Sequence, residues 1–256
     1  MQRIDEAYIL KMAGFEIDCN DGKGEPSACH HAGEFYATVN GEHKRAAEIY
    51  KNNCENNKYG PSCFNLGRYH LSGQGVEQND AKALDYLDRG CKSNLYPACY
   101  FQAMLLYDGM LPAGSIVQSK ASIELLPASK EAKVPLSAPT VPGNTASSSV
   151  QKKSDKPLAL KIFEKACLGG ESNSCSVLAA EYLKPGNPQR NPVKAMEHLR
   201  RACEGNHAPS CYNLAIMFKK GDTGVQPDPE LFEKFKVRTE ELVEMAKGQL
   251  TGVRTN

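Results

Sequence analysis

The residues of this chain with the clearest chemistry are ten cysteines that fall into five short pairs. From the amino-terminal end, the pairs are Cys19/Cys29, Cys54/Cys63, Cys91/Cys99, Cys167/Cys175 and Cys203/Cys211. Nine residues lie between the cysteines of the first pair, eight in the second, and seven in each of the others. Paired thiols can form structural disulfides, bind metal ions or exchange disulfides with a partner. We expect each pair to be a structural disulfide.

The spacing of the cysteines argues against the other two kinds of chemistry. Zinc sites need Cys-x2-Cys or a similarly short spacing, and redox catalysts favour Cys-x-x-Cys; neither occurs here. One pair is nevertheless a candidate for thiol–disulfide exchange. The loop within Cys19/Cys29 is the longest of the five and contains two glycines, so we expect it to be the most flexible.

Two histidines directly follow Cys29 and resemble part of a metal site. Neighbouring side chains on a helix point about 100° apart, so His30 and His31 cannot easily join one site. We expect a surface pair and no metal site. Three methionines lie on apolar helix faces, where core packing is expected and haem ligation is the alternative. They are Met104, Met196 and Met217.

The sequence gives little support for an enzyme. Ser149-x-x-Lys152 matches the first motif of β-lactamases, but it lies in a low-complexity segment and the companion Lys-Thr-Gly is absent. Walker, His-Glu-x-x-His and dinucleotide motifs are also absent. We therefore expect no catalytic residues.

The cysteine pairs recur at a nearly fixed period. Steps between the first cysteines are 35, 37, 76 and 36 residues, so the long step is one period plus an insertion. Such a period indicates stacked repeats. Apolar residues three and four apart predict two helices per unit, as in segments 61–71 and 80–91. The expected fold is all-α: an α-solenoid of five helix pairs after one helix near residues 3–19, clasped by inter-repeat disulfides.

The repeat pattern also predicts how the chain divides. Residues 1–109 hold the first helix and first repeats, and 156–250 hold the remaining repeats and a capping helix from about residue 229. Between them, 110–155 is rich in Ser, Ala, Pro and Lys, a composition typical of disorder within the third repeat. Residues 251–256 form a tail.

Composition limits the classes of partner and the cellular compartments expected for this protein. A net charge of +1 gives no nucleic-acid bias, and no apolar run is long enough to insert in a membrane. The first residues lack the pattern of a secretory signal, yet ten paired cysteines imply an oxidising compartment. The mitochondrial intermembrane space reconciles these two observations; a cytosolic protein with reduced cysteines is the alternative. We expect a monomer.

Several motifs resemble a known repeat family. Lys165-Ala166-Cys167, Arg201-Ala202-Cys203, Phe64–Gly67 and Gly73–Val76 are similar to the Sel-1-like repeat. Cysteines in place of two of its alanines resemble a cysteine-rich subgroup, which includes secreted bacterial proteins and the mitochondrial cytochrome c oxidase assembly factor 7 family. Segments 15–20 and 46–57 look like the latter. The resemblance covers residues 10–250 except 110–155.

This resemblance implies an intermembrane-space factor that supports respiratory-chain assembly, chiefly that of cytochrome c oxidase. We expect it to be a scaffold for assembly proteins or subunits and to be imported through the disulfide relay, with Phe15 beside Cys19 as a docking determinant. Haem handling or thiol–disulfide exchange at the oxidase metal centres, and a generic adaptor role, are alternatives. The expected partner-binding residues lie on first helices: Asn65, Tyr69, Tyr100, Tyr212 and Asn213.

Overall fold

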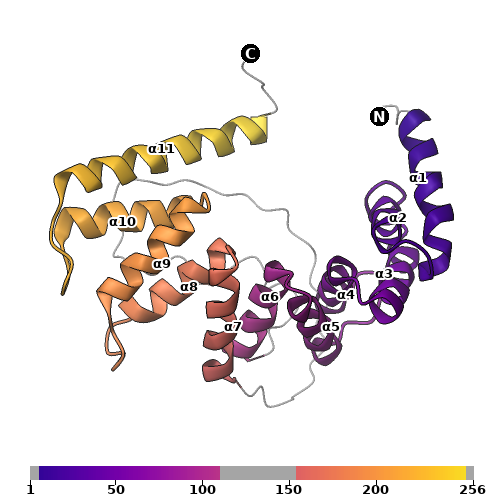
Figure 1. The fold of residues 1–256 in the computed structure, drawn as a ribbon, viewed down its shortest axis with the longest axis horizontal. Helices are drawn as coiled ribbons and strands as arrows, with labels where there is room; N and C mark the ends of the chain where they lie inside the picture. Colours follow the sequence, from indigo (N-terminus) through magenta and orange to yellow (C-terminus); the bar gives the residue numbers. More distant parts are fainter. Residues whose placement is uncertain (1–5, 110–153, 252–256) are drawn as a thin grey trace. The chain divides into compact units, whose positions relative to one another are not determined.

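The computed structural model describes residues 6–109 and 154–251, and every regular element in them is helical (Figure 1). The helices are α1 (Glu6–Cys19), α2 (Pro26–Thr38), α3 (His43–Asn57), α4 (Gly60–Ser72), α5 (Asp80–Lys92), α6 (Tyr96–Tyr107), α7 (Lys156–Leu168), α8 (Ser172–Leu183), α9 (Pro192–Glu204), α10 (Ala208–Lys220) and α11 (Pro229–Thr251). Five helix pairs therefore follow a single helix, which confirms the all-α solenoid expected from the sequence.

The described helices belong to two compact units. The first holds α1 to α6 and the first residues of α7, and the second holds the rest of α7 and α8 to α11. Within the first unit each helix from α1 to α6 packs against the next, as α8 to α11 do in the second. Contacts between sequence neighbours are what a stack of repeats provides. None of the described helices is both long and apolar enough to cross a membrane.

Glycine allows the two helices of a pair to approach closely. A Cβ on Gly67 of α4 would lie 2.9 Å from Cγ of Leu87 in α5, inside van der Waals contact. A Cβ on Gly33 of α2 would lie 2.5 Å from the ring of Tyr50 in α3. Alanines complete these interfaces, and Ala83 of α5 is fully buried. The small residues of the repeat motif are therefore the contact surface of each helix pair.

Asparagine caps begin two of the helices, and a left-handed glycine ends another. Asn79 and Asn191 stand before α5 and α9, and each side-chain oxygen accepts a hydrogen bond from the backbone N–H three residues later. Gly73 closes α4 at φ +70°. Gly75 has φ +72°, and a Cβ there would lie 2.3 Å from the carbonyl oxygen of His43. Only glycine fits at that position.

The predicted insertion lies almost entirely outside the described residues, as does the Ser149–Lys152 motif. The described residues resume at Ser154. Helix α7 begins at Lys156, the position at which the remaining repeats were predicted to begin.

Candidate functional site: disulfide clasps and an apolar groove

All five disulfides have the pairing expected from the spacing. Their Cα–Cα separations run from 4.4 to 4.8 Å, short enough for a bond between two helices that meet at a tight turn. Each clasp joins the end of one helix to the first turns of the next. No cysteine is more than 5% exposed, so the disulfides are part of the core. The bonded pairs are Cys19–Cys29, Cys54–Cys63, Cys91–Cys99, Cys167–Cys175 and Cys203–Cys211.

The sequence did not indicate how deeply the individual sulfur atoms lie. Cys99 and Cys211 are 0% exposed, whereas their partners Cys91 and Cys203 are 5% and 4% exposed. Sγ of Cys99 lies 3.6 Å from the carbonyl oxygen of Cys91, and Sγ of Cys211 lies 3.7 Å from that of Cys203. A disulfide sulfur has no hydrogen to donate, so both contacts are packing. Cys99 and Cys211 are therefore structural anchors at the starts of α6 and α10.

A left-handed residue closes each turn between the clasped cysteines of the four later pairs. Asn94, Gly170 and Asn206 each lie three residues after the first cysteine of their pair and have φ of 62°, 92° and 65°. In the second pair, which is one residue longer, Lys58 takes this role at φ 55°. Asn and Gly tolerate this conformation better than other residues, so the turn fixes the position of the second cysteine.

The loop of the first clasp, which we expected to be the most flexible, is hydrogen-bonded to α3. Residues Asn20–Gly22 form a 3₁₀ turn. The side-chain amide of Asn52 donates to the carbonyl oxygen of Asp21 at 3.3 Å, and that of Asn57 donates to the carbonyl oxygen of Gly22 at 3.1 Å. These hydrogen bonds from α3 tie the loop to the neighbouring helix. Loop length alone did not reveal these tertiary contacts.

The fourth clasp contacts a histidine that sequence reasoning did not select. Nδ1 of His198 lies 3.6 Å from Sγ of Cys167. The ring of His198 stacks on Tyr182, with centroids 5.6 Å apart and planes 4° apart. Burial lowers the pKa of His198, and the nearby positive charge of Arg201 lowers it further. A neutral imidazole is thereby held beside a disulfide sulfur.

The first unit carries the same stack with the two residue types exchanged. His70 lies seven residues after Cys63, as Tyr182 lies seven after Cys175, and Tyr86 stands five residues before Cys91, as His198 stands five before Cys203. The rings of His70 and Tyr86 stack with centroids 5.6 Å apart and planes 3° apart. Aligning the two repeats by their cysteines would have revealed this exchange from sequence.

The two adjacent histidines have different surroundings, which corrects the expectation of a surface pair. The His30 side chain is only 13% exposed and its Nδ1 lies 3.2 Å from Oγ of Ser62. Burial lowers the pKa of His30, although Glu34 opposes this shift. His31 is half exposed and its Nδ1 lies 3.1 Å from the carboxylate of Glu34. Helical geometry separated the rings as predicted, but tertiary packing turned one of them inward against Tyr59.

The methionines named as alternative haem ligands lie in or beside the core. Met104 and Met217 are buried, and Met196 is half-buried against the core of the second unit. Among the described residues, no group of three or more His, Cys, Asp or Glu could hold a metal ion.

The five residues named for partner binding fall in different environments. Tyr69 is half-buried, stacks edge-on against Tyr50 and faces the His43 ring, and Asn65 hydrogen-bonds to Tyr50, so these two contribute to packing within the first unit. Tyr100 and Asn213 are half-buried, whereas Tyr212 is 44% exposed. Their role in binding stays a prediction.

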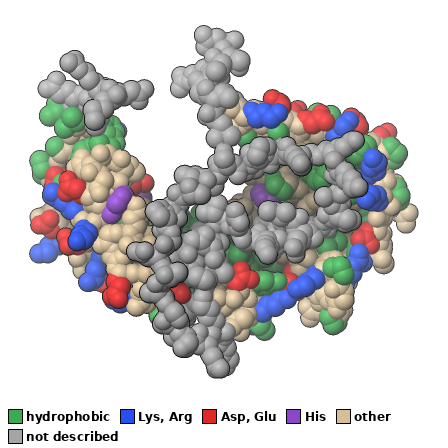
Figure 2. Space-filling view, turned by 180° about the vertical axis from the view of Figure 1, so that it is seen from behind, with side chains coloured by type: hydrophobic (Ala, Val, Ile, Leu, Met, Phe, Trp, Pro, Cys, Tyr) green, Lys and Arg blue, Asp and Glu red, His purple; other side chains and the backbone are tan. Residues whose placement is uncertain are grey.

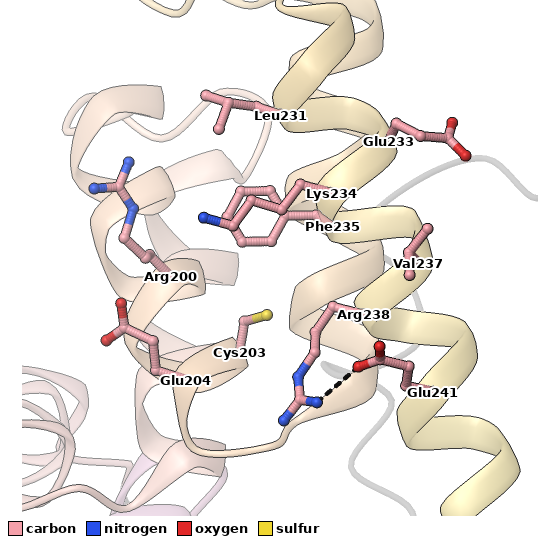
Figure 3. Close-up of a pocket in the computed structure, with 10 residues that line it drawn as sticks. All are labelled: Arg200, Cys203, Glu204, Leu231, Glu233, Lys234, Phe235, Val237, Arg238 and Glu241. Carbon is pink, nitrogen blue, oxygen red and sulfur yellow. Dashed lines mark hydrogen bonds and ion pairs between the residues drawn. The ribbon is translucent and has the colours of Figure 1, made fainter.

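A groove of about 820 Å³ runs between α9 and α11 in the second unit (Figure 3). Leu231 and Phe235 of α11 and Cys203 of α9 give it an apolar lining, and Phe235 stacks on Phe218 of α10 below. Sequence analysis did not select this groove. Seven of its ten lining residues belong to α11, which was predicted as the capping helix of the solenoid.

The charges of the groove are only partly neutralised. Arg238 is paired with Glu241 at 2.9 Å and donates to Oδ1 of Asn206 at 2.7 Å. Arg200 and Lys234 project into the groove from opposite walls (Figure 3). Neither forms an ion pair with a residue that the structure describes. Its lining also includes the carboxylates of Glu204 and Glu233, of which Glu233 is paired with Lys236 outside the groove. The groove therefore offers an apolar floor beside charges of both signs, and a peptide with an apolar side chain next to a carboxylate could place that carboxylate between Arg200 and Lys234.

Comparison with known proteins agrees with the repeat geometry. The Sel1 repeat family matches residues 60–95, 149–171, 172–207 and 208–231, and the ranges 60–95 and 172–207 each span one complete helix pair. Together these matches cover a little under half of the chain. The chain contains Sel1 repeats and is rich in cysteine.

Curated relatives of this chain share most of its length. Cytochrome c oxidase assembly factor 7A of Xenopus laevis is 27% identical over 228 residues, which cover 86% of this chain and 81% of the relative. The cytochrome c oxidase assembly factor 7 homolog of Drosophila melanogaster is 25% identical over 246 residues, covering 94% and 90%. Cytochrome c oxidase assembly factor 7 of Homo sapiens is 25% identical and covers 89% and 70%.

Solved structures support the fold. A Sel1 repeat protein from Oxalobacter formigenes aligns with a TM-score of 0.66 at 16% identity, covering 94% of this chain and 58% of that one. The protective antigen c5321 of uropathogenic Escherichia coli aligns with a TM-score of 0.62 at 19% identity, covering 90% and 41%. This chain thus spans less than two thirds of either solved chain.

Proposed function

We propose that this protein is a mitochondrial intermembrane-space factor that supports cytochrome c oxidase assembly as a disulfide-clasped, partner-binding scaffold. The observation that carries the proposal is the match to oxidase assembly factors over 81% and 90% of their own length. Five buried disulfides fit an oxidising compartment. The intermembrane space combines that chemistry with access to the oxidase, and the disulfide relay is the proposed import route.

Partner binding is assigned to the groove between α9 and α11. A bound segment would place its apolar side chain against Leu231 and Phe235 and its carboxylate between Arg200 and Lys234. The two cations stand on different helices, so a peptide held between them would bridge α9 and α11. The predicted first-helix residues remain a second proposed surface, led by the exposed Tyr212.

Depletion and rescue test the proposal. Cells depleted of this protein should lose cytochrome c oxidase activity, and the wild-type chain should restore it. Arg200→Glu/Lys234→Glu should restore it poorly, because the groove would then repel a carboxylate. Lys161→Glu/Lys220→Glu, which reverses two exposed charges of the second unit outside the groove, is the matched control. Normal oxidase activity after depletion would contradict the assembly role, and full rescue by the groove variant would contradict only the assigned site.

A specific contact favours thiol–disulfide exchange at the fourth clasp as a second candidate function. A partner thiolate that bonds to Sγ of Cys175 breaks the disulfide and releases Cys167 as a thiolate. His198 Nδ1 lies 3.6 Å from that sulfur and could donate a hydrogen bond to it. Both sulfurs are buried, so attack requires the turn between α7 and α8 to open locally.

The second clasp serves as an internal control, because its repeat carries the same ring stack with the histidine and the tyrosine exchanged. His198→Tyr should slow reduction of Cys167–Cys175 by a small thiol, measured by trapping and mass mapping of the free cysteines. The second clasp, Cys54–Cys63, has Tyr86 in the corresponding position of its repeat and should be reduced more slowly in the wild-type protein. Equal reduction rates for the two clasps, or no effect of His198→Tyr, would remove this candidate.

A further inference from the structure

Helix α1 is apolar on two opposite faces. Its inner face packs against α2, with Met12 and Cys19 buried. Its outer face carries Leu10, which is 68% exposed, and Ile17, which is 78% exposed. The apolar face of a helix normally packs against another element. No described residue covers the outer face of α1, so the structure leaves an apolar surface without its counterpart.

The outer residues form one continuous stripe. Leu10, Ala13, Gly14 and Ile17 follow the i, i+3, i+4, i+7 spacing of a single helix face. A Cβ built on Gly14 would meet nothing within 4 Å, so the centre of the stripe is open. Figure 2 shows hydrophobic side chains gathered over the α1 end of the first unit. We call these four residues the α1 stripe.

The order of residues in the α1 stripe is symmetric about the point between Ala13 and Gly14. Each large side chain, Leu10 or Ile17, lies three residues from its small neighbour, and the two small residues are adjacent. Two antiparallel copies centred on this point would set Leu10 of each against Ile17 of the other. The small central residues would let the two backbones approach. Such self-complementarity is what a two-fold interface requires.

Charges on one flank of the stripe fit the same arrangement. Lys11 and Asp18 lie seven residues apart, two helical turns, and therefore on the same side of α1. Both are exposed. In an antiparallel pair with a two-fold axis, this flank of one copy adjoins the same flank of the other with its direction reversed. Lys11 of each copy then lies beside Asp18 of the other, which favours this pairing.

A membrane surface fits the stripe less well. Helices that lie on anionic lipid carry Lys and Arg along the polar edges. Here the stripe is edged by one described cation, Lys11, and by two described anions, Glu16 and Asp18. Glu16 is already engaged by Arg45 of α3 and by the hydroxyl group of Tyr36.

We propose that the α1 stripe is a self-association surface through which two copies of this protein form an antiparallel, two-fold dimer. This departs from the monomer expected from the sequence and does not depend on the function proposed above. The helix has 14 residues and is about 21 Å long. One such helix pair buries less than the roughly 1,200 Å² of a standard interface. The dimer should therefore be weak and concentration-dependent.

Sedimentation equilibrium of the full chain across about 1 µM to 1 mM tests the proposal. The wild-type protein should shift from monomer to dimer within this range. Ile17→Lys should weaken association by at least about tenfold, because it places a charge where Ile17 would pack against Leu10 of the other copy. Leu168→Lys is the matched control, since Leu168 is similarly exposed at 66% but lies in the second unit. Its association should equal that of the wild type.

A charge exchange tests the antiparallel geometry. Lys11→Asp and Asp18→Lys should each weaken the dimer, and the double variant should restore it. A wild-type protein that is monomeric at every concentration would overturn the proposal. Association that survives Ile17→Lys would place any dimer on another surface, and single charge variants with no effect would contradict the antiparallel arrangement. Binding to anionic vesicles by a protein that stays monomeric would reassign the stripe to lipid.

Discussion

Removal of the fifth clasp by Cys203→Ala/Cys211→Ala should destabilise the second unit by about 4.5 kcal/mol. The two cysteines are separated by eight residues in sequence, and closing so short a loop removes roughly 2.5 kcal/mol of chain entropy from the unfolded state. Cys203 is 4% exposed and Cys211 is 0% exposed. Deleting two buried sulfur atoms adds about 1 kcal/mol each for lost packing.

Hydrogen exchange resolved by helix is the appropriate assay, because the chain has two compact units and no tryptophan. In the variant, the free energy of exchange for the amides of α9 and α10 should fall by the whole of this predicted destabilisation. As a control, Cys54→Ala/Cys63→Ala should reduce the protection of α3 and α4 instead, because repeats contact mainly their neighbours. The Cys19/Cys29 clasp, with a separation of ten residues, should differ in its entropic part by only about 0.2 kcal/mol.

Two results would refute this reasoning. A loss below about 1 kcal/mol would mean that the turn holds the helices together without the sulfur bond. A loss spread evenly over both units would mean that the clasp acts on the whole chain and not on its own repeat.

Three further outcomes are expected. Gly67→Ala should cost about 1–3 kcal/mol in urea denaturation, because its Cβ would lie 2.9 Å from Leu87; combined with Leu87→Ala, the added cost should largely disappear. Burial lowers the pKa of His207 below 6.5, so the unfolded state takes up the proton first and stability should fall as the pH drops below 6.5; His207→Gln should flatten this dependence in thermal melts. Burial raises the pKa of Asp222, but hydrogen bonds from Arg190 and the next backbone N–H outweigh it and leave the pKa below 3.8. This stabilisation is present above pH 3.8 and is lost as the pH falls through the folded pKa, and Arg190→Ala should raise the pKa of Asp222 in an NMR titration and cost about 0.5 kcal/mol at neutral pH.

The repeat could be predicted from the sequence because the residues that define each unit lie close together in the chain. A cysteine near the end of one helix and another eight to ten positions later specify a clasped hairpin, and Pro, Asn and Gly mark where helices begin and end. The pairing of all ten cysteines and the count of five helix pairs could therefore be predicted. The deeper burial of Cys99 and Cys211 than of their partners could not, nor could the inward turn of His30, because Ser62 and Tyr59 lie more than 25 residues from it in the chain.

The features of the sites depend on contacts between repeats. The contact of His198 with Cys167 spans 31 residues, and the groove requires α9 and α11 to lie side by side over α10. Periodicity also identified α1 as an apolar helix but could not reveal that only one of its faces would be covered. The sequence by itself determined the helix pairs and their disulfides, since these follow from spacing within one turn of chain. The tertiary structure alone decided which side chains meet and which apolar surfaces stay open, because packing joins residues that no local pattern connects.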